Sequence, residues 1–167
     1  MIGATLHHDR HPGEPDSVRT EFPVRRALRL DQRSEVAKRA RAAIAEHCAG
    51  RVDADVVEQA RLTASELVTN AFEHCTAGIV TLDVSVSGEA IVLTVTSPGA
   101  NHARGMPPVN AWRVPPPTNP SGRGLGMIRR IADEIVLDAG STPDGGQRWQ
   151  AVTVRLTPDS VRSPRSR

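Results

Sequence analysis

Aromatic residues are scarce in this chain. Only 2% of its 167 residues are aromatic, with two Phe, two Trp and no Tyr. Proteins that bind single-stranded nucleic acid stack bases on aromatic side chains, so the composition disfavours that class. The net charge is only +2, without the basic footprint that binds duplex DNA. The sequence therefore predicts an aliphatic core and no direct contact with nucleic acid.

Cysteines and long apolar runs are also lacking. Cys48 and Cys75 form no CxxC motif, which indicates two reduced thiols rather than a disulfide framework. No stretch approaches the ~18 apolar residues of a membrane span, and the N-terminus has no apolar signal core. His7, His8 and His11 lie in a stretch predicted to be disordered and are not expected to form a metal site. We expect a soluble, cytoplasmic protein with no membrane partner.

The length suits one domain with its own core. Residues 1–24 are predicted to form a disordered arm, residues 25–157 the domain, and residues 158–167 a disordered polar tail. Helical periodicity predicts two helices, one from Asp31 or Ser34 to Cys48 and one over 53–74. Alternating apolar patterns predict strands at 26–30, 79–86, 90–96, 135–138 and 149–156. This layout implies an α+β sandwich, in which a mixed sheet carries helices on one face.

A proline-rich segment interrupts this layout. Seven of the thirteen prolines lie between Ser97 and Ser121, so this segment cannot form a helix or a central strand. A loop of this length inside a compact domain is usually a lid or a binding loop. The segment therefore predicts that a ligand site borders it.

The segment Arg61–His74 predicts a helix with two chemically different faces. One face is apolar: Ala64, Leu67, Val68, Ala71 and Phe72. The other is polar: Thr63, Glu66, Thr69, Asn70, Glu73 and His74. Glu66 and Asn70 are four residues apart and stack on the polar face. Such a pair suits a metal–phosphate site, and on spacing alone an ordinary solvated face explains it too.

Three glycines, Gly122, Gly124 and Gly126, occupy alternate positions where another helix is predicted to begin. Glycine permits close approach, and the bare N–H groups of a helix N-terminus favour an anion. A flexible hinge is the alternative explanation for this pattern. The segment lacks the Gly-Lys-Ser/Thr of a P-loop, and it follows a proline-rich loop rather than the strand of a dinucleotide fingerprint.

Together, three elements resemble the GHKL (Bergerat-fold) ATP-binding domains. They are Glu66-x3-Asn70 on a helix, a strand ending in Ser97-Pro98-Gly99, and the glycine-rich turn after the loop. The stretches ELVTNAFEH and GRGLGMIRRIAD look most like the branch of anti-sigma-factor serine/threonine kinases. The resemblance covers about residues 26–156. It implies a two-layer sandwich with a mixed, mostly antiparallel sheet and helices on one face.

The resemblance also implies roles for individual residues, with ATP and Mg²⁺ as cofactors. Asn70 matches the asparagine that holds Mg²⁺ against the triphosphate, and its amide oxygen is a suitable hard ligand. Glu66 matches the carboxylate proposed as the catalytic base. His74 matches a position often occupied by histidine, which we interpret as structural. The residues implied around the phosphates are Gly122, Arg123, Gly124, Leu125 and Gly126.

The chain departs from the family's pattern at Ser97. The family has an aspartate there, two residues before the position of Gly99, and its carboxylate accepts a hydrogen bond from the adenine amino group. A hydroxyl is a weaker, neutral acceptor. Losing a charge-assisted bond costs on the order of 1.5–3 kcal/mol, so adenine selectivity is expected to suffer more than phosphate binding. The family's threonine in the last strand has no identifiable counterpart near Gln150.

Two main hypotheses follow from the resemblance. The first is an ATP-dependent kinase that phosphorylates a serine of a small antagonist protein, sequesters a sigma factor, or does both. The second is a non-catalytic protein-binding module on the same fold, with weak or lost nucleotide binding. A histidine-kinase catalytic domain is a third option, but the chain shows no phosphoacceptor helix. Relatives of this kind often form homodimers.

Overall fold

The computed structural model describes residues 24–30, 35–74, 79–98, 107–114, 123–144 and 146–163. Several predictions fall outside these ranges. They concern the N-terminal arm, residues 164–167, and individual residues: His7, His8, His11, Asp31, Ser34, Cys75, Gly99 and Gly122.

Five strands form one sheet in the order β1-β2-β3-β5-β4. Their bounds are β1 Val24–Leu30, β2 Val80–Ser87, β3 Ala90–Pro98, β4 Glu134–Ser141 and β5 Arg148–Leu156. The five predicted strands are confirmed, and each runs past at least one of its predicted ends. All four strand pairings are antiparallel. The expected mixed sheet is therefore purely antiparallel over the described residues.

The residues Ser87-Gly88-Glu89 lie between two alternating stretches and predict a hairpin, and a tight turn does join β2 to β3. Ser87 pairs with Ala90, which leaves only two residues in the loop. Gly88 has φ +56°, a left-handed conformation that glycine adopts without steric cost. This turn sets the register of the two strands, so that Val84 lies opposite Leu93 and both side chains are buried.

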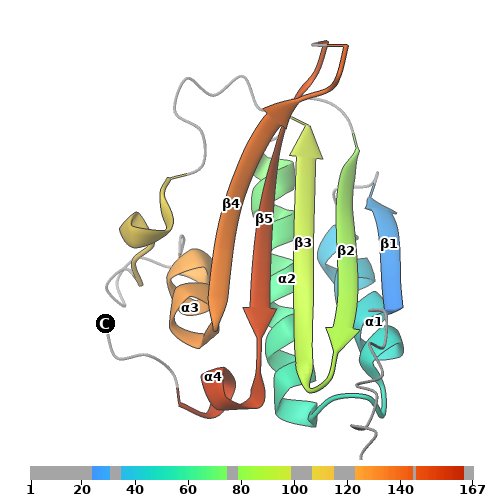
Figure 1. Cartoon of the computed structure of the whole chain (residues 1–167), viewed down its shortest axis with the longest axis vertical. Coiled ribbons are helices and arrows are strands. Elements are labelled where there is room, and N and C mark those ends of the chain that lie inside the picture. Colours follow the sequence, from blue (N-terminus) through green and yellow to red (C-terminus); the bar gives the residue numbers. More distant parts are fainter. Residues whose placement is uncertain are drawn as a thin grey trace, which may run out of the picture.

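Three helices cover one face of the sheet, and no described helix covers the other (Figure 1). They are α1 Val36–Cys48, α2 Ala54–His74 and α3 Gly124–Ile131. The long helix α2 runs behind β3 and β5, with α1 on one side of it and α3 on the other (Figure 1). The predicted α+β sandwich with helices on one face is confirmed.

Two predictions about local structure are wrong. Residues 158–167 are not entirely tail, because Pro158–Arg162 form a short helix, α4. A capping box between Thr157 and Ser160 starts it, and Pro158 suits its first turn. Thr63 does not lie on the polar face of α2, since only 1% of it is exposed. Its helical neighbours Ala60 and Leu67, three residues before it and four after it, are buried as well, so Thr63 lies at the edge of the apolar face.

The core between the sheet and the helices is aliphatic, as the composition predicts. Its largest fully buried side chains are Ile44, Leu67, Leu82, Ile91, Leu93, Ile128 and Leu156. Among the described aromatic residues, Trp112 is the buried one, and the half-buried Phe72 packs against the core. Trp112 is only 3% exposed, although it comes from the proline-rich segment predicted to be a loop. That segment is therefore partly docked on the domain.

Cys48 is fully buried and carries a free thiol at the end of α1. Burial raises the pKa of this thiol above its ordinary value, and the nearby Arg51 charge opposes the shift in part. The folded protein therefore holds the Cys48 proton at pH values where the unfolded chain has lost it. Stability from this thiol is present below the ordinary thiol pKa and is lost as pH rises through the raised one.

We expect the Tm of the Cys75→Ser variant to fall more between pH 8 and pH 10 than that of the Cys48→Ala/Cys75→Ser variant. The Cys48 thiol should also react with a thiol reagent far more slowly in the folded protein than in denaturant. Equal pH dependence of the two variants, measured by thermal denaturation, would contradict this prediction.

None of the described helices is long and apolar enough to cross a lipid bilayer.

Candidate functional site

The predicted polar pair lies on the middle and C-terminal part of α2. Glu66 is exposed and Asn70 is half-buried. Four residues of α-helix advance about 6 Å and make slightly more than one turn, so the two side chains lie on the same side of the helix. The opposite side of α2 presses Leu67, Val68 and Ala71 into the core. The apolar residues thus fix the rotation of α2 about its axis. In this orientation the Glu66 carboxylate and the Asn70 amide lie on the side of α2 that faces away from the core.

The first turn of α3 meets this pair. A methyl group added to Gly124 would touch the Glu66 carboxylate oxygen and lie 2.6 Å from its Cδ and 2.8 Å from its Cγ. With the Glu66 side chain in this position, a methyl group does not fit between it and α3, so the glycine at position 124 permits the contact. The structure therefore brings two of the predicted motifs together. Asn70 lies one turn further along the same side of α2.

The spacing of the glycines has a second structural reason. A methyl group on Gly126 would collide with the main chain of Arg113 and Val114. Two residues correspond to about 200° around a helix, so Gly124 and Gly126 face nearly opposite sides of α3. Both glycines are buried inside the first turn of this helix. Close packing on two sides explains the described pair better than a flexible hinge does.

The electrostatics of this junction suit an anion. The first N–H groups of an α-helix have no intrahelical acceptor, and the helix dipole places partial positive charge there. Arg123, half-buried, occupies the N-cap position of α3, and its carbonyl accepts from Met127 at 3.0 Å. Leu125 is half-buried against the core and carries no charge to the site. A phosphate group would find the helix N-terminus and Arg123 favourable and the Glu66 carboxylate repulsive unless a cation or a proton intervened.

Ser97 lies near the end of β3 and is 3% exposed. It pairs across the strands with Gln150 of β5, and both residues are on the helix side of the sheet. Gln150 is half-buried, and its amide can both donate and accept hydrogen bonds. The register thus identifies Gln150 as the neighbour of Ser97 in the last strand. Sequence reasoning missed this pairing because the register between distant strands is not visible in the sequence.

Two further residues at α3 escaped sequence reasoning. The Arg129 guanidinium donates hydrogen bonds to the carbonyls of Asn110 and Trp112, both at 3.2 Å. The indole N–H of Trp112 donates to the Pro107 carbonyl at 2.9 Å. These residues hold a short 3-10 helix, η1 Val109–Ala111, beside α3. The burial of Trp112 could have been predicted from the scarcity of aromatic residues. When a chain has only two tryptophans and one lies in a proline-rich loop, its large apolar side chain is expected to pack against the core.

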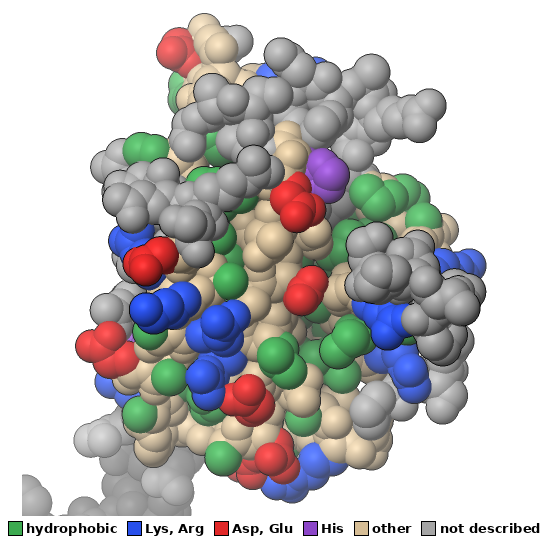
Figure 2. Space-filling view, turned by 180° about the vertical axis from the view of Figure 1, so that it is seen from behind, with side chains coloured by type: hydrophobic (Ala, Val, Ile, Leu, Met, Phe, Trp, Pro, Cys, Tyr) green, Lys and Arg blue, Asp and Glu red, His purple; other side chains and the backbone are tan. Residues whose placement is uncertain are grey.

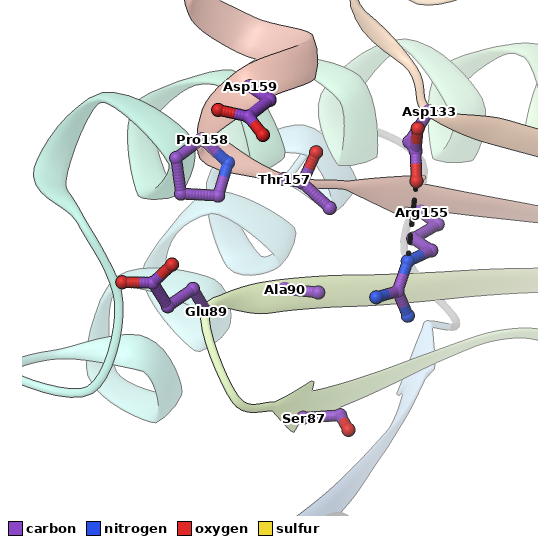
Figure 3. Close-up of a pocket in the computed structure, with 8 residues that line it drawn as sticks. All are labelled: Ser87, Glu89, Ala90, Asp133, Arg155, Thr157, Pro158 and Asp159. Atoms are coloured by element: carbon purple, nitrogen blue, oxygen red, sulfur yellow. Dashed lines mark ion pairs between the residues drawn. The ribbon is translucent and has the colours of Figure 1, made fainter.

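A hollow of about 410 Å³ lies at the opposite end of the sheet (Figure 3). Ser87, Glu89 and Ala90 reach it from the β2–β3 hairpin, and the remaining lining residues are Asp133, Arg155, Thr157, Pro158 and Asp159. Arg155 forms an ion pair with Asp133 at 3.5 Å, which leaves two further carboxylates in the lining. Ala90 and Ser97 are seven residues apart on one strand, or roughly 23 Å. This acidic hollow is therefore separate from the predicted site and unsuited to a triphosphate.

The side of the molecule that carries the helices shows acidic and basic side chains scattered among neutral ones (Figure 2). No large patch of a single sign is visible on this face, in agreement with the small net charge. Within the described ranges, no group of three or more His, Cys, Asp or Glu residues could hold a metal ion. A divalent cation at Asn70 would thus need further ligands from a bound phosphate or from water.

A family model for the histidine kinase-like ATPase domain matches residues 28–149, which is most of the chain. The match contains Glu66, Asn70, Ser97 and the first turn of α3. A search among curated proteins finds none that matches this chain.

Proposed function

Because the chain belongs to the histidine kinase-like ATPase (GHKL) domain family, we propose that it binds Mg-ATP at the junction of α2 and α3 and transfers the γ-phosphate to a protein serine. Domains of this family bind ATP, usually with Mg²⁺. The observation that carries the proposal is the contact between the Glu66 carboxylate and Gly124 at the start of α3. It brings a carboxylate next to a helix N-terminus, and these are the two groups that proton transfer and phosphate binding would need.

The donors at this junction fit the proposed ligand. Asn70 would hold the magnesium ion, which neutralises phosphate charge when it is bound. The start of α3 and Arg123 would hold phosphate oxygens, since both favour negative charge. Glu66 would accept the proton of the attacking serine hydroxyl, and its exposure leaves room for a protein substrate. Positioning of the hydroxyl would supply much of the remaining rate enhancement.

We further propose that the substrate is a small antagonist protein and that the chain also sequesters a sigma factor. Support comes from the stretches around Glu66 and Gly124, which resemble the anti-sigma-factor kinase branch. The scattered surface charge also fits a protein partner better than a nucleic acid. Phosphate transfer would then switch the antagonist between a bound and a free form through the added negative charge.

Ser97 favours a second candidate function. It is buried and neutral at the position where the family has an aspartate, and its strand neighbour is Gln150 rather than an identifiable threonine. A chain that holds the base weakly could act by protein contact alone, as a non-catalytic binding module. Nucleotide binding separates the two candidates.

We expect Mg-ATP to stabilise the protein. At a hundredfold excess over Kd, binding to the folded state adds about 2.7 kcal/mol to the free energy of unfolding. For a chain of this size, that corresponds to a rise in Tm of roughly 5–10 °C, which thermal denaturation with and without Mg-ATP measures.

Two variants of α2 control this experiment. Asn70→Ala should lose most of the Tm shift, whereas Glu73→Gln, at an exposed position one turn later, should keep it. An unchanged Tm of the unsubstituted protein at millimolar Mg-ATP would favour the binding module.

A further inference from the structure

We infer that Arg129 and Trp112 are positioning residues: they hold residues 107–114 against α3 and thereby fix the first turn of α3 at the proposed phosphate site. The inference has two parts. That the 107–114 segment holds α3 depends only on the structure, whereas its effect on nucleotide affinity rests on the proposed function.

Arg129 makes the polar half of this attachment. It lies in the last turn of α3, and one nitrogen of its guanidinium donates to two main-chain carbonyls, those of Asn110 and Trp112. Both carbonyls belong to η1 or to its C-cap residue. Hydrogen bonds from a charged donor are stronger than neutral ones, and they bind here to backbone that cannot rotate away. Arg129 thus fastens the segment to α3.

Trp112 makes the apolar half. Its ring is almost entirely buried and belongs to the same core cluster as Ile128 of α3. Its indole N–H is satisfied by the Pro107 carbonyl at 2.9 Å, which ties the start of the segment to its middle. Val109 and Leu125 are half-buried against the same cluster. Burial of a large aromatic side chain supplies most of the stability of such a contact.

The consequence for the site comes through Gly126. The main chain of Arg113 and Val114 lies so close to this glycine that no methyl group fits between them. Glu66 contacts Gly124 on nearly the opposite side of the same turn. The N–H groups proposed to bind phosphate therefore lie on a turn held from one side by α2 and from the other by the 107–114 segment. Loosening the segment should let this turn move.

The first test uses the protein without nucleotide. The Met127 amide, which donates to the Arg123 carbonyl at 3.0 Å, reports on the first turn of α3. In Arg129→Met we expect its hydrogen exchange, measured by NMR, to become about tenfold faster. Arg129→Lys should recover most of the protection, because an ammonium can also donate to two carbonyls. The matched control is Arg130→Met, an exposed neighbour on α3, which should leave this exchange unchanged.

The second test measures Kd for Mg-ADP by calorimetry in the same variants. We expect about tenfold weaker binding in Arg129→Met, recovery in Arg129→Lys, and no change in Arg130→Met. If Arg129→Met does not fold, Trp112→Phe serves in its place, since it removes the donor to Pro107 and keeps an aromatic ring. In the Arg129 variants, a Trp149→Phe background leaves Trp112 as the only tryptophan, so quenching of its emission by acrylamide shows whether the segment has loosened.

Each outcome decides a part of the inference. Unchanged Met127 exchange in Arg129→Met would overturn the attachment itself. Faster exchange with unchanged Mg-ADP affinity would show that Arg129 serves packing and does not position the phosphate site. Equal losses in Arg129→Met and Arg130→Met would indicate a general effect of positive charge and would also overturn it. If the unsubstituted protein binds neither Mg-ADP nor Mg-ATP, the proposed function is wrong, and so is the part of the inference that concerns nucleotide affinity. The exchange data then decide alone whether the 107–114 segment holds α3.

Discussion

Replacing Glu66 by glutamine is expected to lower phosphate transfer by about 10²–10⁴-fold, the usual contribution of a positioned general base. Glutamine keeps the size and shape of the side chain against Gly124, so the junction of α2 and α3 should remain intact. What it removes is the ability to accept the proton of the attacking hydroxyl. The measurement is transfer of label from γ-labelled Mg-ATP to a candidate small antagonist protein.

The matched measurement is the affinity of Glu66→Gln for Mg-ATP, which should change little or increase. The substitution removes a negative charge from the place where the phosphates would be bound, and with it a repulsion. Glu73→Gln, which removes a charge from an exposed position of the same helix, should transfer label at the unsubstituted rate. Unchanged transfer in Glu66→Gln would exclude Glu66 as the base. A parallel loss of transfer and of Mg-ATP binding would assign it to binding instead.

Replacing Gly126 by alanine should reduce the free energy of unfolding by about 3 kcal/mol, near the upper end for an overpacked site. The added methyl would collide with main-chain atoms of Arg113 and Val114, which cannot move aside as a side chain can. The expected fall in Tm is roughly 6–12 °C. Thermal or urea denaturation of the protein without nucleotide measures it.

Gly124→Ala is the natural control, since it makes the same chemical change two residues earlier. Its methyl group would meet only the side chain of Glu66, which is exposed and can rotate away. Alanine also gains about 0.8–1 kcal/mol of helix propensity over glycine. We expect a Tm close to that of the unsubstituted protein, together with a loss of phosphate transfer because Glu66 is displaced. Equal destabilisation by both substitutions would contradict the packing described around α3.

Most of the architecture follows from local patterns in the sequence. The alternation in Val80–Ser87 and Ala90–Pro98, with a glycine between them, predicts the β2–β3 hairpin. The helical spacing of apolar residues predicts α2 to within one residue at its start. These elements carry their own signals, so the two-layer arrangement and the exposure of Glu66 could be predicted before the structure.

The features that could not be predicted depend on contacts between segments that are distant in the sequence. Thr63 is a polar residue that the helical projection of α2 places with the exposed ones, yet it is buried in the folded protein. The pairing of Ser97 with Gln150 depends on a strand register that no single segment specifies. The role of Gly126 depends on the backbone of the proline-rich segment, which sequence reasoning treated only as a loop.

The prediction missed the helix α4 for a different reason. Its signal was local, since Thr157 at the N-cap is followed by Pro158 at the first helical position and by Ser160 at the third. The capping pattern uses serine where glutamate or glutamine is usual, and the helix is only five residues long. Short helices carry too little periodicity to be distinguished from a polar tail, so the cap was the only available indication.

The placement of the two glycines on nearly opposite sides of α3 limits how this helix can respond to a ligand. Sideways tilting of its N-terminus would press the helix against the Glu66 side chain in one direction and against the Arg113–Val114 main chain in the other. The movements that remain are translation along the helix axis and a small rotation about that axis. A ligand that displaces α3 should therefore produce a small screw-like shift, which the short Ala132–Asp133 link passes to the edge strand β4 while the other four strands stay in place.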